Sequence, residues 1–212
     1  MTRGQLLVVE GLEGAGKSTA ISTLQAVLQE HGLNVITTRE PGGTLLGEAV
    51  RELLKQTSAE VMDPRAELLL FYAARVQLLE SVIKPALAAG TWVLADRWEL
   101  SSFAYQGGGR GMSEHMLNHL SEFCVGHMQP DLLFYLDISP EIGLQRAQTR
   151  GKLDRIEQES IDFFNTVHTA YHRYLKRIPS SVFIDASQPL LTVQDALKVA
   201  MTHYLNTQYV CA

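Results

Sequence analysis

The stretch "QLLVVEGLEGAGKST" (residues 5–19) determines how the rest of the sequence is interpreted. Residues 5–10 contain a continuous apolar run that predicts a buried strand, and Ser18 and Thr19 begin a helical pattern. Between them, residues 11–18 have the spacing G-x-x-x-x-G-K-[ST] of a phosphate-binding loop. Such a loop surrounds a polyanion with backbone N–H groups at a helix N-terminus. The strand–loop–helix order therefore predicts a nucleoside triphosphate site.

Glu13 places a carboxylate inside this loop. At about 6 Å and an effective dielectric near 20, two like charges repel by on the order of 3 kcal/mol, so this residue opposes phosphate binding. Lys17 is expected to reach the β- and γ-phosphates, and Ser18 to offer its hydroxyl to Mg²⁺. The loop thus raises the question of what the Glu13 carboxylate does.

The rest of the chain alternates apolar runs with helical patterns. Continuous rather than alternating hydrophobicity is typical of parallel strands that are covered on both faces. We predict one doubly wound, five-stranded parallel sheet, whose ligands bind at the carboxyl ends of the strands. The expected strands are 5–10, 33–37, 91–96, 131–137 and 181–185. The expected helices are roughly 18–31, 44–56, 64–89, 113–126, 140–149, 158–177 and 190–205, and Pro85 is expected to kink the third of them.

Composition indicates one soluble globular domain. The chain has 212 residues, of which 46% are hydrophobic, and its net charge of −5 argues against a nucleic-acid footprint over the whole chain. The two cysteines, Cys124 and Cys211, form no metal-spaced cluster and suit a reducing compartment. Residues 1–5 lead directly into a strand, so we expect no signal peptide and no membrane span. The expected location is the cytoplasm, with neither nucleic acid nor membrane as a partner.

Asp96 and Asp137 each end a predicted strand. Asp96 could hold Mg²⁺ through water, and the adjacent Arg97 could grip a phosphate; the alternative is a helix cap beside a surface ion pair. Asp137 is followed by Ser139 and Pro140, and we therefore interpret it as a turn or cap residue.

Three polar segments complete the candidate site. "REPGGT" (39–44) and "YQGGGRG" (105–111) are interpreted as acceptor contacts, although either could be only a turn. The two glycines of the first segment allow close backbone approach, and the second combines an aromatic, an amide and flexible backbone. "RGKLDR" (150–155) gathers basic residues around Gly151 and predicts a lid over about 148–159; the alternative is a solvated basic loop.

Taken together, these motifs and "FYAARVQ" (71–77) resemble bacterial thymidylate kinases over nearly the whole chain and in the same order. The chain is similar to the subgroup whose lid, rather than its phosphate loop, supplies arginine. One departure is Trp98, because that family usually has Tyr or His after Asp-Arg, and we expect only a packing variation there. The resemblance implies the α/β class, with a single P-loop nucleoside monophosphate kinase-like domain over residues 1–212, a phosphate loop at 11–18 and a small lid.

The resemblance also implies an activity: Mg²⁺-dependent transfer of the γ-phosphoryl group of ATP to dTMP, giving dTDP and ADP for DNA synthesis, by a homodimer. Phe71 would stack on thymine, Tyr105 would crowd the sugar, and Glu13 would accept a hydrogen bond from its 3′-hydroxyl. Arg75, Ser102 and Gln106 would hydrogen-bond the base edge. Arg39, Arg51 and Arg97 would hold the acceptor phosphate, and Arg150 and Arg155 would close over the transferring group. The expected ATP-binding residues are Gly11, Leu12, Glu13, Gly14, Ala15, Gly16, Lys17, Ser18 and Thr19. The expected dTMP-binding residues are Glu13, Arg39, Pro41, Arg51, Phe71, Arg75, Arg97, Ser102, Tyr105 and Gln106. The expected catalytic residues are Lys17, Asp96, Arg97, Arg150 and Arg155, with Ser18 and Asp96 (through water) on the metal.

Two other functions stay open at this point. Another P-loop nucleoside monophosphate kinase would share the phosphate loop but not the thymidylate motifs. A regulatory P-loop ATPase would hydrolyse ATP without any acceptor. A GTPase is disfavoured, since the sequence has neither [NT]-K-x-D nor D-x-x-G.

Overall fold

The computed structural model describes residues 3–210, with side chains over 3–207. The chain start, on which the expectation about a signal peptide partly depends, and Cys211 lie outside the described residues. The described chain forms a five-stranded, all-parallel sheet in the order β2-β3-β1-β4-β5, which confirms the predicted doubly wound sheet. The strands are β1 (Leu6–Gly11), β2 (Val35–Arg39), β3 (Trp92–Asp96), β4 (Leu132–Asp137) and β5 (Ser181–Asp185).

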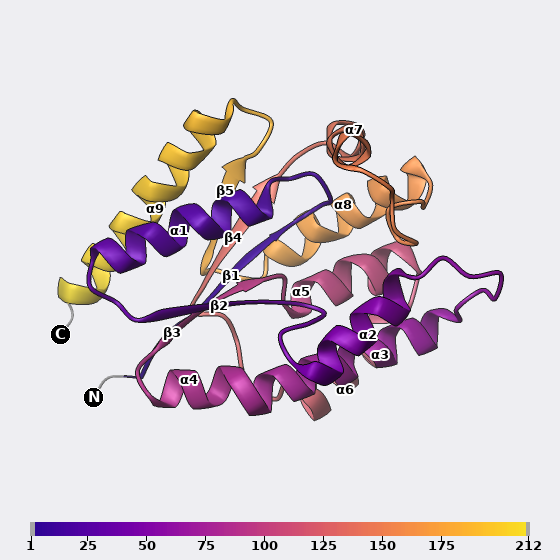
Figure 1. Ribbon diagram of the computed structural model, residues 1–212, viewed down its shortest axis with the longest axis horizontal. Helices are drawn as coiled ribbons and strands as arrows, with labels where there is room; N and C mark the ends of the chain where they lie inside the picture. The colour runs from indigo at the N-terminus through magenta and orange to yellow at the C-terminus, as the bar shows by residue number, and fades with distance from the viewer. Residues whose placement is uncertain (1–2, 211–212) are drawn as a thin grey trace.

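Helices cover both faces of this sheet (Figure 1). Helices α1 (Lys17–Glu30) and α9 (Leu190–Val210) pack together on one face, and the long helix that begins with α3 (Pro64–Leu78) lies on the other. The remaining helices are α2 (Leu45–Lys55), α4 (Lys84–Ala88), α5 (Glu99–Ser102), α6 (Glu114–Cys124), α7 (Pro140–Arg150) and α8 (Ile161–Leu175). No helix of the described chain combines the length and apolarity that crossing a membrane requires.

The position of β1 follows from its sequence. All six of its residues are buried, as expected for the central strand of a sheet covered on both sides, whereas β2 and β5 are partly exposed at the two edges. The chain leaves β1 at Gly11 and enters α1 at Lys17, so the phosphate loop lies at the carboxyl end of the middle strand. The ends of β2 and β3 meet it there, since Arg39 pairs in register with Asp96.

The helix predicted at 64–89 has a π-helical turn inside it. Helix α3 continues through η1 (Leu79–Ile83) into α4 without a break in the chain direction. The Lys84 N–H donates to the Leu79 carbonyl five residues earlier, next to Pro85, which has no N–H to donate. The proline is therefore accommodated by one wider turn.

Residues 99–109 are helical, which the sequence patterns did not predict. Helix α5 continues as the π-helix η2 (Phe103–Gly109), although three glycines weaken any helical signal. A Cβ on Gly109 would lie 2.4 Å from the Phe163 ring, and one on Gly108 would lie 2.5 Å from the Cβ of Ala170. The flexible backbone expected over 105–111 is therefore wrong: the glycines let α8 pack closely against η2.

Asp137 is not a cap. The N-cap of α7 is Ser139, whose side chain accepts a hydrogen bond from the Ile142 N–H. The Asp137 carboxylate instead contacts two histidines of α8, His168 and His172. The turn-or-cap interpretation is therefore wrong, because a neighbouring helix offers the carboxylate long-range partners.

Candidate active site

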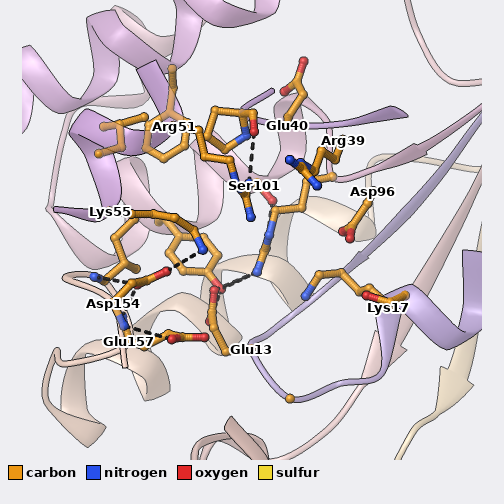
Figure 2. Close-up of a pocket in the computed structure, with 18 of the residues that line it drawn as sticks. Glu13, Lys17, Arg39, Glu40, Arg51, Lys55, Asp96, Ser101, Asp154 and Glu157 are labelled. Atoms are coloured by element: carbon orange, nitrogen blue, oxygen red, sulfur yellow. Dashed lines mark hydrogen bonds and ion pairs between the residues drawn. The ribbon is translucent and has the colours of Figure 1, made fainter. Parts of the chain in front are cut away.

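A cavity of about 600 Å³ lies at the carboxyl edge of the sheet and brings most of the predicted site residues together. In Figure 2, Asp96 at the end of β3 and Lys17 at the start of α1 face it from one side, and Lys55, Asp154 and Glu157 face it from the opposite side. The predicted residues in its lining are Glu13, Gly14, Gly16, Lys17, Ser18, Thr19, Arg39, Pro41, Arg51, Phe71, Asp96, Arg97, Ser102, Tyr105, Gln106 and Arg150. The predicted residues outside the lining are Gly11, Leu12, Ala15, Arg75 and Arg155.

The conformation of the phosphate loop depends on close backbone packing against α7. Gly14 has φ +72°, and a Cβ there would lie 2.1 Å from the carbonyl oxygen of Gly143 at the start of α7. Within the loop, the Lys17 ammonium donates to the carbonyls of Gly11 (3.1 Å) and Leu12 (2.8 Å). Burial, reinforced by the nearby Arg97 charge, lowers the pKa of Lys17 to about 8. A polyanion in the loop would raise this pKa again, because it stabilises the charged ammonium.

Glu13 is already paired in the structure. Its Oε1 accepts a hydrogen bond from Arg97 Nη2 at 2.7 Å, and its Oε2 accepts one from the Tyr105 hydroxyl at 2.5 Å. The side chains of Glu13 and Arg97 are only 13% and 16% exposed, so water screens this ion pair weakly. The charge that seemed to oppose phosphate binding is therefore balanced by the arginine expected to hold the acceptor phosphate.

A second glutamate, Glu10, fixes the backbone that carries Arg97, and sequence reasoning missed it. Arg97 has φ +72°, a left-handed conformation that is uncommon for a residue with a side chain. The fully buried Glu10 carboxylate accepts hydrogen bonds from the N–H groups of Trp98 (2.8 Å) and Ser101 (3.2 Å) and from the Tyr171 hydroxyl (2.9 Å). An acidic residue at the end of a buried apolar strand is the sequence signal that could have found it.

The metal-binding prediction for Asp96 fits the structure. Its Oδ1 is buried and has no hydrogen-bond partner among the described residues, and both Asp96 and Ser18 line the cavity. An unpaired buried carboxylate oxygen is costly unless a cation or water reaches it. Carboxylate, hydroxyl and water oxygens are the donors that Mg²⁺ prefers. The cap alternative for Asp96 finds no support, since Trp98 is the N-cap of α5 and makes no side-chain cap.

Of the four residues predicted to bind the base, three line the cavity and one lies behind them. Phe71, Ser102 and Gln106 line the cavity, whereas Arg75 is 1% exposed and lies behind them. Its Nη1 donates to Ser102 Oγ at 3.0 Å, and its Nε donates to Glu40 Oε2 at 2.7 Å. In this structure Arg75 therefore holds Ser102 in place and does not itself face the cavity.

Trp98, the departure from the usual motif, is 2% exposed. The Arg75 guanidinium lies 5.8 Å from the centroid of its ring. This burial beside Arg75 agrees with the expected role of Trp98 in packing.

The two lid arginines point in different directions. Arg150 lines the cavity, with 66% of its side chain exposed, and pairs with Glu157. Arg155 is turned away: its Nε donates to the Leu54 carbonyl at 2.9 Å, and its Nη2 forms an ion pair with Glu67 at 2.7 Å. The expectation that both arginines close over the phosphoryl group is therefore corrected for this structure, in which Arg155 anchors the lid to α2 and α3.

Glu67 is the centre of a buried network that sequence reasoning also missed. Its carboxylate accepts hydrogen bonds from Gln106 Nε2 (2.8 Å) and from Arg110 Nε (3.2 Å) and Nη2 (3.1 Å). Together with the ion pair to Arg155, these contacts connect α3, η2 and the lid. Because Gln106 also lines the cavity, Glu67 links the lid to the proposed base-binding side.

Several other lining residues had no sequence signal of their own. Lys55 at the end of α2 forms an ion pair with Asp154 of the lid at 3.2 Å, and Figure 2 shows this pair facing the cavity. Arg146 on α7 donates to the Ala186 carbonyl at 2.9 Å while lining the cavity. The lining residues that were not predicted individually are Leu54, Lys55, Ser101 and Arg146, together with Glu40 of the predicted segment 39–44 and Lys152, Asp154, Ile156 and Glu157 of the predicted lid.

Comparison with known proteins agrees with this geometry. The family model described as thymidylate kinase matches residues 9–197. A protein named thymidylate kinase from Legionella pneumophila (strain Corby) is 53% identical over 204 residues, which cover 96% of this chain and 96% of that protein. A protein of the same name from Legionella pneumophila (strain Paris) is 52% identical over 204 residues, again with 96% of each chain covered.

Proposed function

The chain belongs to the thymidylate kinase family, and we propose how its cavity carries out the reaction of that family. The enzyme transfers the γ-phosphoryl group of ATP to dTMP, giving dTDP and ADP. The observation that carries our assignment of the site is the Glu13–Arg97 pair, which joins the phosphate loop to the acceptor side of one cavity. Donor and acceptor can thereby meet without leaving that cavity.

The donor triphosphate binds the loop at residues 11–18. Backbone N–H groups and the N-terminus of α1 provide positive partial charge, and Lys17 exchanges its loop carbonyls for phosphate oxygens. Mg²⁺, when bound, neutralises charge on the β- and γ-phosphates. The Ser18 hydroxyl would hold it directly and the unpaired oxygen of Asp96 would hold it through water.

The acceptor dTMP lies between α3, η2 and the end of β2. Phe71 stacks on thymine, Ser102 and Gln106 offer hydrogen bonds to the base edge, and Tyr105 limits the space beside the sugar. Arg39, Arg51 and Arg97 gather positive charge for the acceptor phosphate, with Pro41 packed beside them. Glu13 accepts a hydrogen bond from the 3′-hydroxyl while Arg97 holds its carboxylate in position.

Phosphoryl transfer requires positioning and charge neutralisation more than covalent participation by the protein. The dTMP phosphate oxygen attacks the γ-phosphorus in line, the bond from that phosphorus to the β,γ-bridging oxygen breaks, and ADP leaves with the electron pair. Arg150 from the lid and Lys17 from the loop face the transferring group and stabilise its charge. Closure of the lid over 148–159 excludes water, which would otherwise hydrolyse ATP.

We propose that the enzyme is a homodimer. Several apolar residues of the helix at 64–89, including Leu68, Tyr72 and Leu78, are buried within the monomer. Leu69 on α3 and Phe123 on α6 are exposed apolar residues, at 56% and 88% exposure, and these two helices contact each other. The homodimer predicts that Phe123→Glu shifts the mass measured by light scattering toward the monomer. We place the enzyme in the cytoplasm, where ATP and dTMP occur.

The proposal is tested by ATP consumption with and without nucleoside monophosphates. We expect Mg²⁺- and dTMP-dependent ADP formation, with dUMP as the second substrate, because a missing methyl in an apolar pocket costs about 1–3 kcal/mol. ADP formation with dCMP, AMP or GMP should be far slower than with dTMP. Faster reaction with a purine monophosphate would overturn the acceptor assignment. ATP hydrolysis that is equally fast without any acceptor would favour the regulatory ATPase instead.

A further inference from the structure

Three potential metal ligands converge outside the cavity described above. Asp137 is the last residue of β4, and His168 and His172 lie one helical turn apart on the same face of α8. Asp137 Oδ1 is 2.8 Å from His168 Nε2 and 3.1 Å from His172 Nε2, and the two Nε2 atoms are 3.1 Å apart. None of the three residues lines the active-site cavity.

Hydrogen bonding between one carboxylate and two neutral imidazoles cannot satisfy all three contacts. The carboxylate oxygen carries only lone pairs, and each neutral Nε2 carries either a hydrogen or a lone pair. If both Nε2 atoms carry hydrogen, the two hydrogens face each other between the rings. If either Nε2 lacks hydrogen, its lone pair points at the carboxylate oxygen. Every assignment leaves at least one contact between like partial charges, whereas a cation at the centre is attracted by all three atoms.

The donor set and its size fit a small transition-metal ion. Zinc binds histidine nitrogen at about 2.0–2.1 Å and carboxylate oxygen at about 2.0–2.2 Å, so tetrahedral ligand atoms lie about 3.4 Å apart. The separations of 2.8–3.1 Å observed here require each ligand to move by only a few tenths of an ångström. Imidazole with carboxylate suits zinc and its late first-row neighbours, whereas Mg²⁺ prefers oxygen ligands.

The surroundings hold the ligands in place while leaving them accessible. The His172 ring packs edge-on against Tyr135 at 5.6 Å and beside Phe183 at 5.9 Å between centroids. The side chains of Asp137, His168 and His172 are 35%, 27% and 36% exposed, so solvent can reach the site and complete the coordination. We propose that Asp137, His168 and His172 bind one divalent transition-metal ion, Zn²⁺ above all, at a site distinct from the phosphoryl-transfer centre.

Bound zinc would connect the end of β4 to α8 directly. The neighbouring residue Tyr171 donates to Glu10 and contacts Arg97, so α8 already supports the active site from the same turn. A ligand that binds only the folded state stabilises it by mass action. We therefore expect zinc to raise the thermal midpoint of the free enzyme.

The test is zinc titration of the full-length, untagged and chelator-treated enzyme by calorimetry in the absence of nucleotide. We expect a saturable site for one ion per chain that excess Mg²⁺ does not displace. His168→Ala combined with His172→Ala should weaken zinc binding at least tenfold and abolish the thermal shift. Asp137→Asn should weaken it in the same direction. Substitution of Co²⁺ should give the visible absorption of a low-coordinate nitrogen and oxygen site in the unaltered enzyme alone.

The matched control is a second histidine pair with the same helical spacing. His115 and His119 on α6 have rings 4.2 Å apart, but their ring nitrogens have no carboxylate partner among the described contacts. Replacing both with alanine should leave the zinc titration unchanged. The proposal fails if the unaltered enzyme shows no saturable zinc binding, or if the His168/His172 variant, folded by circular dichroism, binds zinc as tightly as the unaltered enzyme does.

Discussion

Nη2 of Arg97 donates a hydrogen bond of 2.7 Å to Oε1 of Glu13, and this pair connects the end of β3 to the phosphate loop. The Glu13 carboxylate alone would repel phosphates, and the Arg97 guanidinium balances its charge. We propose that this pair lies where the acceptor sugar meets the donor phosphates.

Glu13→Ala should remove the preference for an acceptor that carries a 3′-hydroxyl. A hydrogen bond to a charged group is worth about 1.5–3 kcal/mol, so the unaltered enzyme should prefer dTMP to 3′-deoxy-dTMP roughly ten- to a hundredfold. In the variant that preference should fall to near unity, since the hydroxyl has no partner. The measurement is kcat/KM for both enzymes with both substrates, analysed as a double-mutant cycle.

Tyr105→Phe is the matched control, because it removes the other donor to Glu13 and keeps the carboxylate. It should retain the preference for the 3′-hydroxyl. Additive losses for Glu13→Ala and the deoxy substrate would show that Glu13 orders the loop and does not bind the sugar.

The two lid arginines should differ in their kinetic effects. Arginines that stabilise a phosphoryl-transfer transition state contribute about 10³–10⁵ in rate, so Arg150→Ala should lower kcat by at least about a hundredfold. Arg155→Ala should lower kcat less and raise KM, because Arg155 anchors the lid to Glu67 and the Leu54 carbonyl. Steady-state kinetics of both variants provides the comparison. A larger loss of kcat in Arg155→Ala would mean that Arg155 turns into the cavity during turnover.

Glu67→Gln should destabilise the fold and release the lid. The change removes the carboxylate that Arg110 and Arg155 share, and losing one partner of a buried ion pair costs about 3–5 kcal/mol. Denaturant unfolding should show this loss, and proteolysis within 148–159 should become faster. Glu159→Gln, which removes a more exposed partner of Arg110, should cost less than about 1 kcal/mol.

The same residue predicts an acid-dependent loss of stability. Burial by itself raises the pKa of the Glu67 carboxyl, but hydrogen bonds from Arg110 and Gln106 outweigh burial and lower it below 4.5. The contribution of Glu67 is therefore fully present above pH 4.5 and is lost as the pH falls through the lower pKa of the folded state. In Glu67→Gln the acid limb of the stability curve should be less steep, and an identical limb in both proteins would contradict this.

Lys17 predicts weaker ATP binding at alkaline pH. Because the pKa of Lys17 in the free enzyme is lowered to about 8, ATP affinity should fall about tenfold per pH unit above 8 until the pKa of the complex is reached. Calorimetric titration of a non-hydrolysable ATP analogue between pH 7 and about 9.5 measures this fall. Lys17→Gln should bind weakly at every pH, without the inflection.

Proton linkage provides an independent check on Lys17. At about pH 8, ATP binding should take up protons, and the heat should then differ between buffers of different ionisation enthalpy. In the free enzyme, the unfolded chain holds more protons than the folded one between about pH 8 and 10.5, so the Lys17 contribution to stability should rise with pH there. Absence of proton uptake would place the pKa of Lys17 outside this range.

The sequence alone predicted the elements of the fold and much of the site. Apolar runs of five to seven residues located all five strands, although β2 lies two residues beyond the predicted 33–37. The signal is clearest for β1, because a central parallel strand must be apolar on both faces. The glycine and lysine spacing of residues 11–18 located the phosphate loop, and the strand ends indicated Asp96 and Arg97. These signals are local, since each depends on residues close together along the chain.

Only the tertiary structure decided which side chains are partners. Arg75 and Arg155 belong to the predicted motifs, yet buried carboxylates on other elements, Glu40 and Glu67, turn both of them away from the cavity. The sequence predicted a flexible segment at the glycines of η2, but α8 packs against them. It predicted a cap at Asp137, but two histidines of the same helix are its partners. The physical reason is that a buried charge or hydrogen-bonding group takes its partner from whichever element the fold brings within reach, and no local pattern records that distance.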